Sequence, residues 1–143
     1  MGLSFYSLNE LDTAEILLLK SLEIRSELEN LGNLGSSTNA LALVYIEQGR
    51  KEEAMLYFRK AYDLWKRASD YEGLSIVTEN LASEYFRNND LDSVIFYSLE
   101  AVKYGEKGNH LPFLFEPYMT LAETFEKKGN FKKLYFIKRK QCH

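Results

Sequence analysis

The sequence repeats one pattern with a period of about 40 residues, and this repeat constrains the fold more than any other feature. Steps of that length connect four small or aliphatic positions: Ala14, Ala54, Val94 and Leu134. Nine residues before each position lies an aromatic residue: Phe5, Tyr45, Tyr85 and Phe125. Five residues before each lies a residue type that tolerates a left-handed turn, namely Asn9, Gly49, Asn89 and Gly129. Each unit therefore predicts a helix, a turn and a second helix.

Apolar spacing within the units gives the same prediction. From Leu41 to Trp65 the apolar residues fall mostly three and four positions apart, as on one face of a helix, and the chain contains only 2 Pro and 8 Gly. We expect helices near 9–29, 34–48, 51–68, 72–88, 91–108, 112–128 and 131–141, preceded by the end of a truncated helix. Pro117 either resets the start of the sixth helix or kinks it.

The predicted fold is all-α: an α-α superhelix of three complete repeats and a truncated N-terminal one. We expect one domain over 1–143, with units at about 1–33, 34–73, 74–113 and 114–143. Tyr45, Ala54, Tyr85 and Leu121 occupy recurrent positions and should be largely buried. The expected incomplete units at both ends predict exposed apolar side chains at Leu3, Phe5, Leu8, Leu11, Leu134, Phe136 and Ile137. Such surfaces predict a fragment of a longer protein and a tendency to form homodimers.

At these positions the sequence resembles the tetratricopeptide repeat. Leu41, Ala42, Tyr45, Ala54, Phe58 and Ala61 match its pattern, with Thr38 in the place of the family's Trp. The period is longer than that of the standard repeat, so the helices or their connections must be longer. This long form is similar to the repeats of kinesin light chains, of MalT-type regulators, and of sensor segments in bacterial two-component and LuxR-like regulators.

The resemblance implies a protein–protein interaction module that binds a peptide or helix in a concave groove. Its predicted role is the sensory or regulatory segment of a larger bacterial signalling protein. A self-association module of a larger regulator is the alternative. A response-regulator phosphatase of similar repeats is the third reading, although such proteins need an additional N-terminal helical domain.

The repeat register predicts which side chains line the groove. These are Asn39, Leu43, Ile46 and Glu47, then Ile76, Glu79, Asn80, Ser83, Phe86 and Arg87, then Met119, Glu123, Glu126 and Lys127. An amide can pair with the backbone of any extended peptide, and the resemblance implies a peptide contact for Asn80. Asn39 lies one residue out of that register. The alternative role for both is a surface amide bonded to water or to a neighbouring helix.

Several groove residues have competing roles. The carboxylate clamp of chaperone-binding relatives is not assembled, because Asn39, Glu79 and Met119 occupy its positions. Phe86 and Ile46 are either apolar anchors or packing between helices. Arg87 and Lys127 either meet acidic groups of a ligand or are solvated charges.

Catalysis, metal binding and membrane insertion are not predicted. The longest aliphatic run is Ile16 to Leu19, and no export signal precedes it. Cys142 is the single cysteine, and His110 and His143 have no zinc-site spacing. We expect a cytoplasmic binding protein without a cofactor.

Charge is concentrated at the C-terminal end. Residues 1–126 carry 11 basic and 21 acidic side chains, whereas 127–143 carry 7 basic and none acidic. This basic block, within 127–140, could contact nucleic acid or another anionic surface, or precede a further region. The simpler interpretation is that cations stabilise and solubilise a C-terminal helix. Nucleic acid is not the expected partner, because the rest of the chain repels phosphate.

Overall fold

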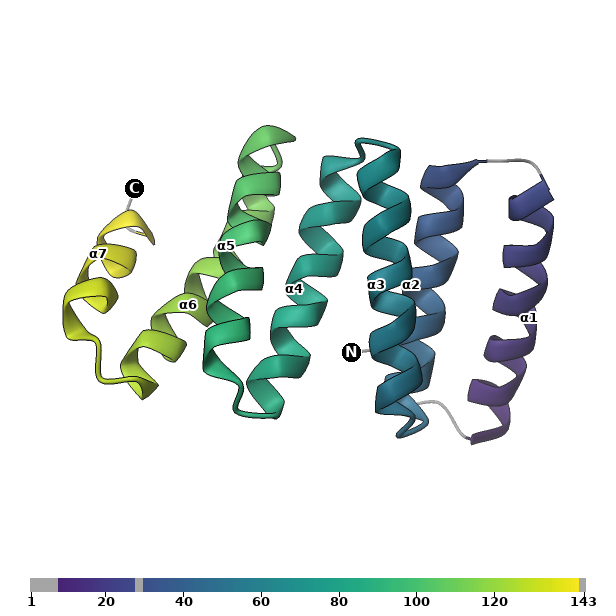
Figure 1. Ribbon diagram of the computed structural model, residues 1–143, viewed down its shortest axis with the longest axis horizontal. Helices are drawn as coiled ribbons and strands as arrows, with labels where there is room; N and C mark the ends of the chain where they lie inside the picture. Colours follow the sequence, from purple (N-terminus) through teal and green to yellow (C-terminus); the bar gives the residue numbers. More distant parts are fainter. Residues whose placement is uncertain (1–7, 28–29, 142–143) are drawn as a thin grey trace. The chain divides into compact units, whose positions relative to one another are not determined.

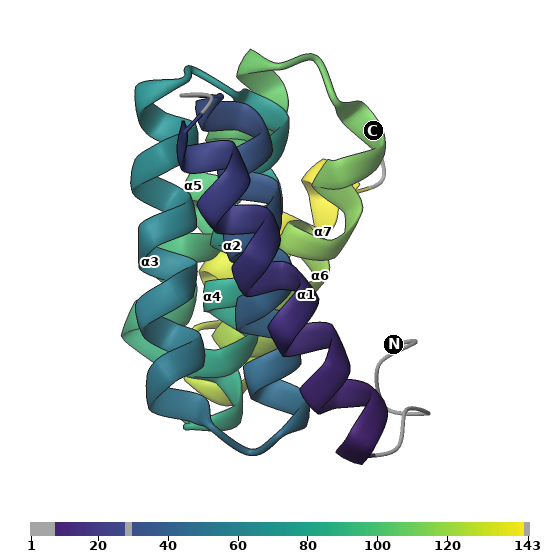
Figure 2. The ribbon, with the colours of Figure 1, turned by 90° about the vertical axis from the view of Figure 1, so that its right-hand side faces the viewer.

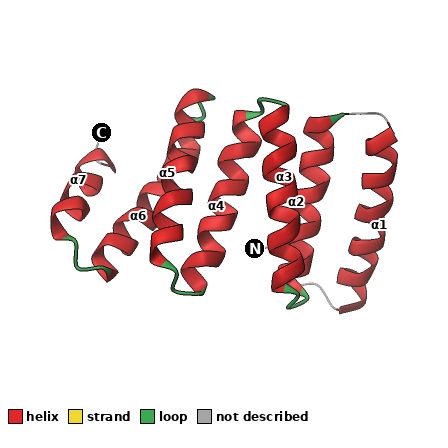
Figure 3. Cartoon of the chain, in the orientation of Figure 1, coloured by secondary structure: helices red, strands yellow, loops and turns green. Residues whose placement is uncertain are grey.

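A computed structural model describes residues 8–27 and 30–141, and within these ranges it contains helices and no strands (Figures 1 and 3). The elements are α1 (Leu8–Glu27), α2 (Leu31–Glu47), α3 (Lys51–Arg67), α4 (Tyr71–Arg87), α5 (Leu91–Lys107), the 3₁₀-helix η2 (Leu111–Leu114), α6 (Phe115–Lys127) and α7 (Phe131–Gln141). The predicted all-α fold of paired repeat helices is confirmed. The expected truncated helix before α1 lies outside the described residues.

The five turns from α2 to α7 share one geometry. The middle residue of each turn has a positive φ between 52° and 77°: Gly49, Ser69, Asn89, Asn109 and Gly129. The N–H of the following residue donates to a carbonyl five residues earlier, as from Arg50 to Tyr45 at 2.8 Å and from Asn130 to Phe125 at 2.9 Å. The predicted turns at Gly49, Asn89 and Gly129 are confirmed. Asn9 instead lies within α1, so the expected turn there is wrong.

Four helices begin with a side-chain cap. Side chains of Asn30, Asp70, Asp90 and Asn130 accept hydrogen bonds, at 2.9–3.3 Å, from the backbone N–H three residues later. Such caps satisfy amides that lack partners in the first helical turn. The turns therefore recur at half of the period seen in the sequence, whereas Arg50 before α3 and His110 before η2 form no side-chain cap.

Two compact units make up the chain, Met1–Gly73 and Leu74–His143, with the boundary inside α4. In the first unit α1 packs on α2 and α2 packs on α3. Figure 2 shows α1 running obliquely to α2. The family-pattern residues of α2 and α3 form the core, each no more than 3% exposed: Leu41, Ala42, Tyr45, Ala54, Phe58 and Ala61.

Charged groups link α1 to the turn before α3. Arg50 Nη1 donates to both Glu15 carboxylate oxygens at 2.9–3.0 Å, and Arg50 also pairs with Glu53. Gln48 donates to Glu15 at 3.1 Å. These bonds hold the first half of α1 against the end of α2.

The only tryptophan in the sequence, Trp65, packs tightly between glycines of the first unit. It is 4% exposed, and its Nε1 donates to the Gly32 carbonyl at 3.2 Å. A Cβ atom added at Gly35 would lie 2.7 Å from Trp65 Nε1, and one at Gly73 would lie 2.3 Å from Trp65 Cδ2. The missing side chains are what allow the backbone to approach the indole ring.

In the second unit α5, η2, α6 and α7 pack in succession. Leu121, Phe125, Leu134 and Ile137 form an apolar cluster between α6 and α7. α6 begins two residues before Pro117, which therefore sits in its first turn and resets the helix after η2.

Burial corrects part of the predicted core and of the predicted exposed ends. Tyr85 is only half-buried, and its ring stacks on Tyr97 at 5.4 Å. Leu11, Leu134 and Ile137 are buried, contrary to the prediction, whereas Phe136 is 57% exposed as expected. The buried residues point to a neighbouring helix, because even a terminal helix packs one face. Leu3, Phe5 and the side chain of Leu8 lie outside what the structure describes.

Candidate functional site

A pocket in the second unit brings together residues of α4 with residues of η2 and α6. Its volume is about 220 Å³. Ser75, Ile76, Glu79 and Asn80 line it from α4, and Pro112, Phe113 and Glu116 line it from η2 and the start of α6. Three of these, Ile76, Glu79 and Asn80, were predicted to face a groove. We call this site the Glu79 pocket.

Glu79 is the most perturbed acid of the pocket. Thr120 Oγ1 donates to Glu79 Oε1 at 3.0 Å, which joins α4 to α6. Glu79 Oε2 is buried and has no hydrogen-bond partner among the described residues. Burial raises the pKa of Glu79 to about 7, and the negative charge of Glu116 adds to the shift while the Thr120 bond opposes it. The site therefore holds a carboxyl group poised between its two protonation states near neutral pH.

The walls around Glu79 are largely apolar and remain accessible. Ile76 and Phe113 are each 37% exposed, and the Phe113 ring stacks on His110 at 5.6 Å. Ser75 Oγ donates to the Ala101 carbonyl at 3.3 Å, so this hydroxyl is engaged by α5. Asn80 is half-buried at the pocket wall. The pocket thus offers an apolar surface with carboxyl and amide groups beside it.

Other predicted residues gather near the C-terminal ends of α4 and α6. Lys127 Nζ lies 4.3 Å from the centre of the Phe86 ring, a cation–π contact. Arg87 pairs at 2.9 Å with Glu84, whose side chain is 7% exposed. Arg87 therefore has a structural partner in addition to any role toward a ligand. Of the remaining residues in this unit, Ser83 is half-buried, and Met119, Glu123 and Glu126 are exposed.

The predicted residues of the first unit lie on α2. Leu43, Ile46 and Glu47 are half-buried, whereas Asn39 is buried at 8% exposure. Asn39 is therefore less available to a partner than Asn80, consistent with its position one residue out of register.

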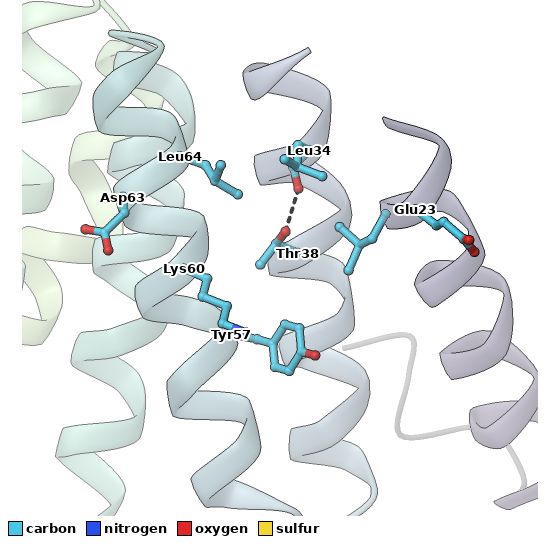
Figure 4. Close-up of a pocket in the computed structure, with 8 residues that line it drawn as sticks. Glu23, Leu34, Thr38, Tyr57, Lys60, Asp63 and Leu64 are labelled. Carbon is cyan, nitrogen blue, oxygen red and sulfur yellow. Dashed lines mark hydrogen bonds between the residues drawn. The ribbon is translucent and has the colours of Figure 1, made fainter. Parts of the chain in front are cut away.

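A second hollow, in the first unit, was not predicted from the sequence. It has a volume of about 480 Å³ and lies among α1, α2 and α3 (Figure 4). Its lining combines apolar and charged side chains: Leu22, Glu23, Leu34, Thr38, Tyr57, Lys60, Asp63 and Leu64. The Thr38 hydroxyl donates to the Leu34 carbonyl at 2.6 Å, and Lys60 Nζ lies 4.7 Å from the centre of the Tyr57 ring. Only the spacing of Tyr57, Lys60 and Leu64 along α3 signals this surface in the sequence.

Two searches of the described residues found nothing. No cluster of three or more histidine, cysteine, aspartate or glutamate side chains suited to a metal ion occurs in 8–27 and 30–141. None of the helices in that part of the chain has both the length and the apolar character needed to cross a membrane.

Comparison with known proteins supports the repeat assignment. Residues 1–67 match the family model of the tetratricopeptide repeat. No curated protein matches the chain. The family match and the all-α helical repeat together support a tetratricopeptide repeat family, whose members generally mediate protein–protein interaction.

Proposed function

We propose that this protein is an interaction module that binds an extended peptide or a helix of a partner protein. The observation that carries the proposal is the Glu79 pocket, in which three of the residues predicted to face a groove lie around one cavity. Helical repeats present such surfaces to peptides, with side-chain pockets providing specificity. The module would serve as the sensory or regulatory segment of a larger cytoplasmic signalling protein of the two-component or LuxR-like kind.

Asn80 is the residue we assign to the backbone of the bound peptide. Its side chain is an amide, the group that can both donate to and accept from a peptide backbone, and it lies at the wall of the pocket with Ile76. Arg87 is a poorer choice for a binding test, because its removal would leave Glu84 as a nearly buried charge without its ion pair.

A peptide-display selection on the whole chain, followed by calorimetry, tests the proposal. Asn80→Ala should weaken a selected peptide by about 0.5–3 kcal/mol, the cost of a lost hydrogen bond. Asn88→Ala is the matched control, because Asn88 is an exposed amide in the turn after α4. Equal affinity of both variants for every selected peptide would place binding elsewhere on the chain.

A second candidate function is self-association through the terminal helices, favoured by their exposed faces. α1 exposes Ile16, Leu17 and Ile24 at 56–61%, and α7 exposes Phe131, Tyr135 and Phe136 at 57–69%. α1 carries five acidic and two basic residues, whereas α7 carries five basic and none acidic. Apolar character and opposite charge would let α7 of one copy pack on α1 of another.

Sedimentation of the wild-type chain at increasing concentration tests this candidate. Such a head-to-tail contact predicts oligomers that dissociate on dilution and in Leu17→Glu or Phe136→Glu variants. A wild-type chain that stays monomeric at high concentration would rule out self-association and leave the peptide-binding module unaffected.

A further inference from the structure

The charges and the walls of the Glu79 pocket define the chemistry of what it can bind. We propose that this pocket binds a basic side chain, lysine or arginine, of the partner peptide, with its charged end beside Glu79 and Glu116 and its stem against Ile76, Pro112 and Phe113. The inference rests on the proposed function and specifies the residue class that anchors the partner.

The first argument is the uncompensated negative charge. Glu79 Oε2 has no partner among the described residues, and the bond from Thr120 reaches only Oε1. None of the lysine, arginine or histidine side chains in the described ranges forms an ion pair with Glu79 or Glu116. A bound cation would offset the burial of one carboxylate and its repulsion by the other. A ligand with an acidic group would add a third negative charge and would be repelled by both carboxylates.

The second argument is the raised proton affinity of Glu79. Burial and the charge of Glu116 favour the protonated form, which keeps the pKa near 7. A cation that enters the pocket favours the ionised form instead. Near neutral pH the carboxyl group can therefore supply its charge when a basic side chain arrives, at the small cost of releasing a proton.

The third argument is the shape and polarity of the walls. Lysine and arginine carry long apolar stems that pack on hydrophobic surface while the charged end seeks polar partners. Ile76, Pro112 and Phe113 supply that surface, and the Phe113 ring adds a face that attracts cations. At about 220 Å³ the pocket is smaller than the roughly 300–1,000 Å³ typical of sites for drug-sized ligands. It fits one side chain better than a whole small molecule.

The test uses a minimal probe that does not require the native partner. The probe is lysine with its α-amine acetylated and its carboxyl group converted to a methylamide, so that the side-chain amine stays free. It is titrated into the isotope-labelled whole chain, and the chemical shifts of the backbone amides are followed by NMR. The neutral isostere acetyl-norleucine-methylamide is the comparison probe. We expect the lysine probe to shift the amides of Ile76, Glu79 and Phe113 with saturation, and the norleucine probe to bind about tenfold more weakly or not at all.

Variants of the two carboxylates complete the test. Glu116→Gln should weaken the lysine probe about two- to fivefold, as for an exposed charge, and Glu79→Gln should weaken it about tenfold. Asp92→Asn removes a carboxylate of α5 that lies outside both the pocket lining and the predicted groove, with a side chain that is 85% exposed, and should leave binding unchanged. The amide spectrum of each variant shows whether it is folded.

Two results would overturn the inference: equal binding of both probes, or lysine binding that survives both carboxylate substitutions. Failure of the proposed function has a different signature. The lysine probe would then bind at the pocket as expected, while peptides selected on the chain would keep their affinity in the Asn80→Ala variant.

Discussion

The contact between Trp65 and Gly73 predicts that Gly73→Ala lowers stability, whereas helix propensity alone predicts that it raises stability. Within a helix, alanine is ordinarily more stable than glycine by about 1 kcal/mol. Gly73→Ala would place a Cβ atom 2.3 Å from Trp65 Cδ2, whereas carbon atoms in contact lie about 3.5–4.0 Å apart. The indole ring would therefore have to move by about 1 Å or more to restore an ordinary contact.

The surroundings of Trp65 resist that movement. Its Nε1 is bonded to the Gly32 carbonyl, and the α2 backbone approaches the ring at Gly35. Overpacking of this kind costs about 1–3 kcal/mol, which exceeds or cancels the propensity gain. The expected net effect of Gly73→Ala is therefore a loss of up to about 2 kcal/mol in the first unit, with a melting temperature lower by up to several degrees.

Trp65 fluorescence provides the assay, because the single tryptophan reports on the first unit. Urea unfolding followed by this signal and by circular dichroism gives the free energy of unfolding. The matched control is Gly32→Ala, whose new Cβ would meet nothing closer than 3.8 Å and should leave stability equal or slightly higher. A Gly73→Ala variant as stable as the wild type, with unchanged emission, would refute the packing argument.

Three further changes test the core and the pocket. Ala54→Phe should cost about 1–3 kcal/mol by overpacking, because Ala54 is 0% exposed, while Leu56→Phe at a half-exposed position should be near neutral in thermal melts. Ser98→Ala should raise the free energy of unfolding by about 0.5–1 kcal/mol, because the buried Ser98 hydroxyl has no partner in the described part of the chain; a loss of stability would show a missed bond. The raised pKa of Glu79 in the folded state gives a component of stability that is fully present below about pH 4.5 and is lost as pH rises through about 7, so in urea titrations the free energy of unfolding of the wild type should fall relative to that of Glu79→Gln across this range.

Much of the fold follows from the sequence because its determinants are local and repeated. The apolar spacing fixes the helices, and the positions of Leu41, Ala42 and Tyr45 fix the face that packs. The predicted helix bounds include breaks at 69–71 and 109–111, but the left-handed geometry that these turns share with the others was not predicted, because the turns use different residue types. Gly49 and Asn89 signal a left-handed conformation, but Ser69 does so only weakly, and its turn depends on the bond from Asp70 N–H to the Trp65 carbonyl.

The candidate site was only partly predictable. The register places Ile76, Glu79 and Asn80 on one face of α4, so their proximity could be predicted. The raised pKa of Glu79 could not be predicted, because it depends in part on Glu116 and Thr120, which lie beyond α5 in the chain. Those residues reach α4 only after η2 and Pro117 have set the start of α6.

The structure also resolves where the long repeat places its extra residues, and this bears on the length of the partner. Each connection from α2 onward is short, such as 48–50 and 88–90, so the residues beyond the standard repeat lengthen the helices by about one turn each. On α4, Ile76 in the pocket and Phe86 beside Lys127 are about 15 Å apart along the helix axis. An extended peptide rises about 3.3 Å per residue. A partner that contacts both ends of this face therefore needs about five residues. It would place a basic side chain at the pocket end and a side chain without positive charge beside Lys127 at the other end.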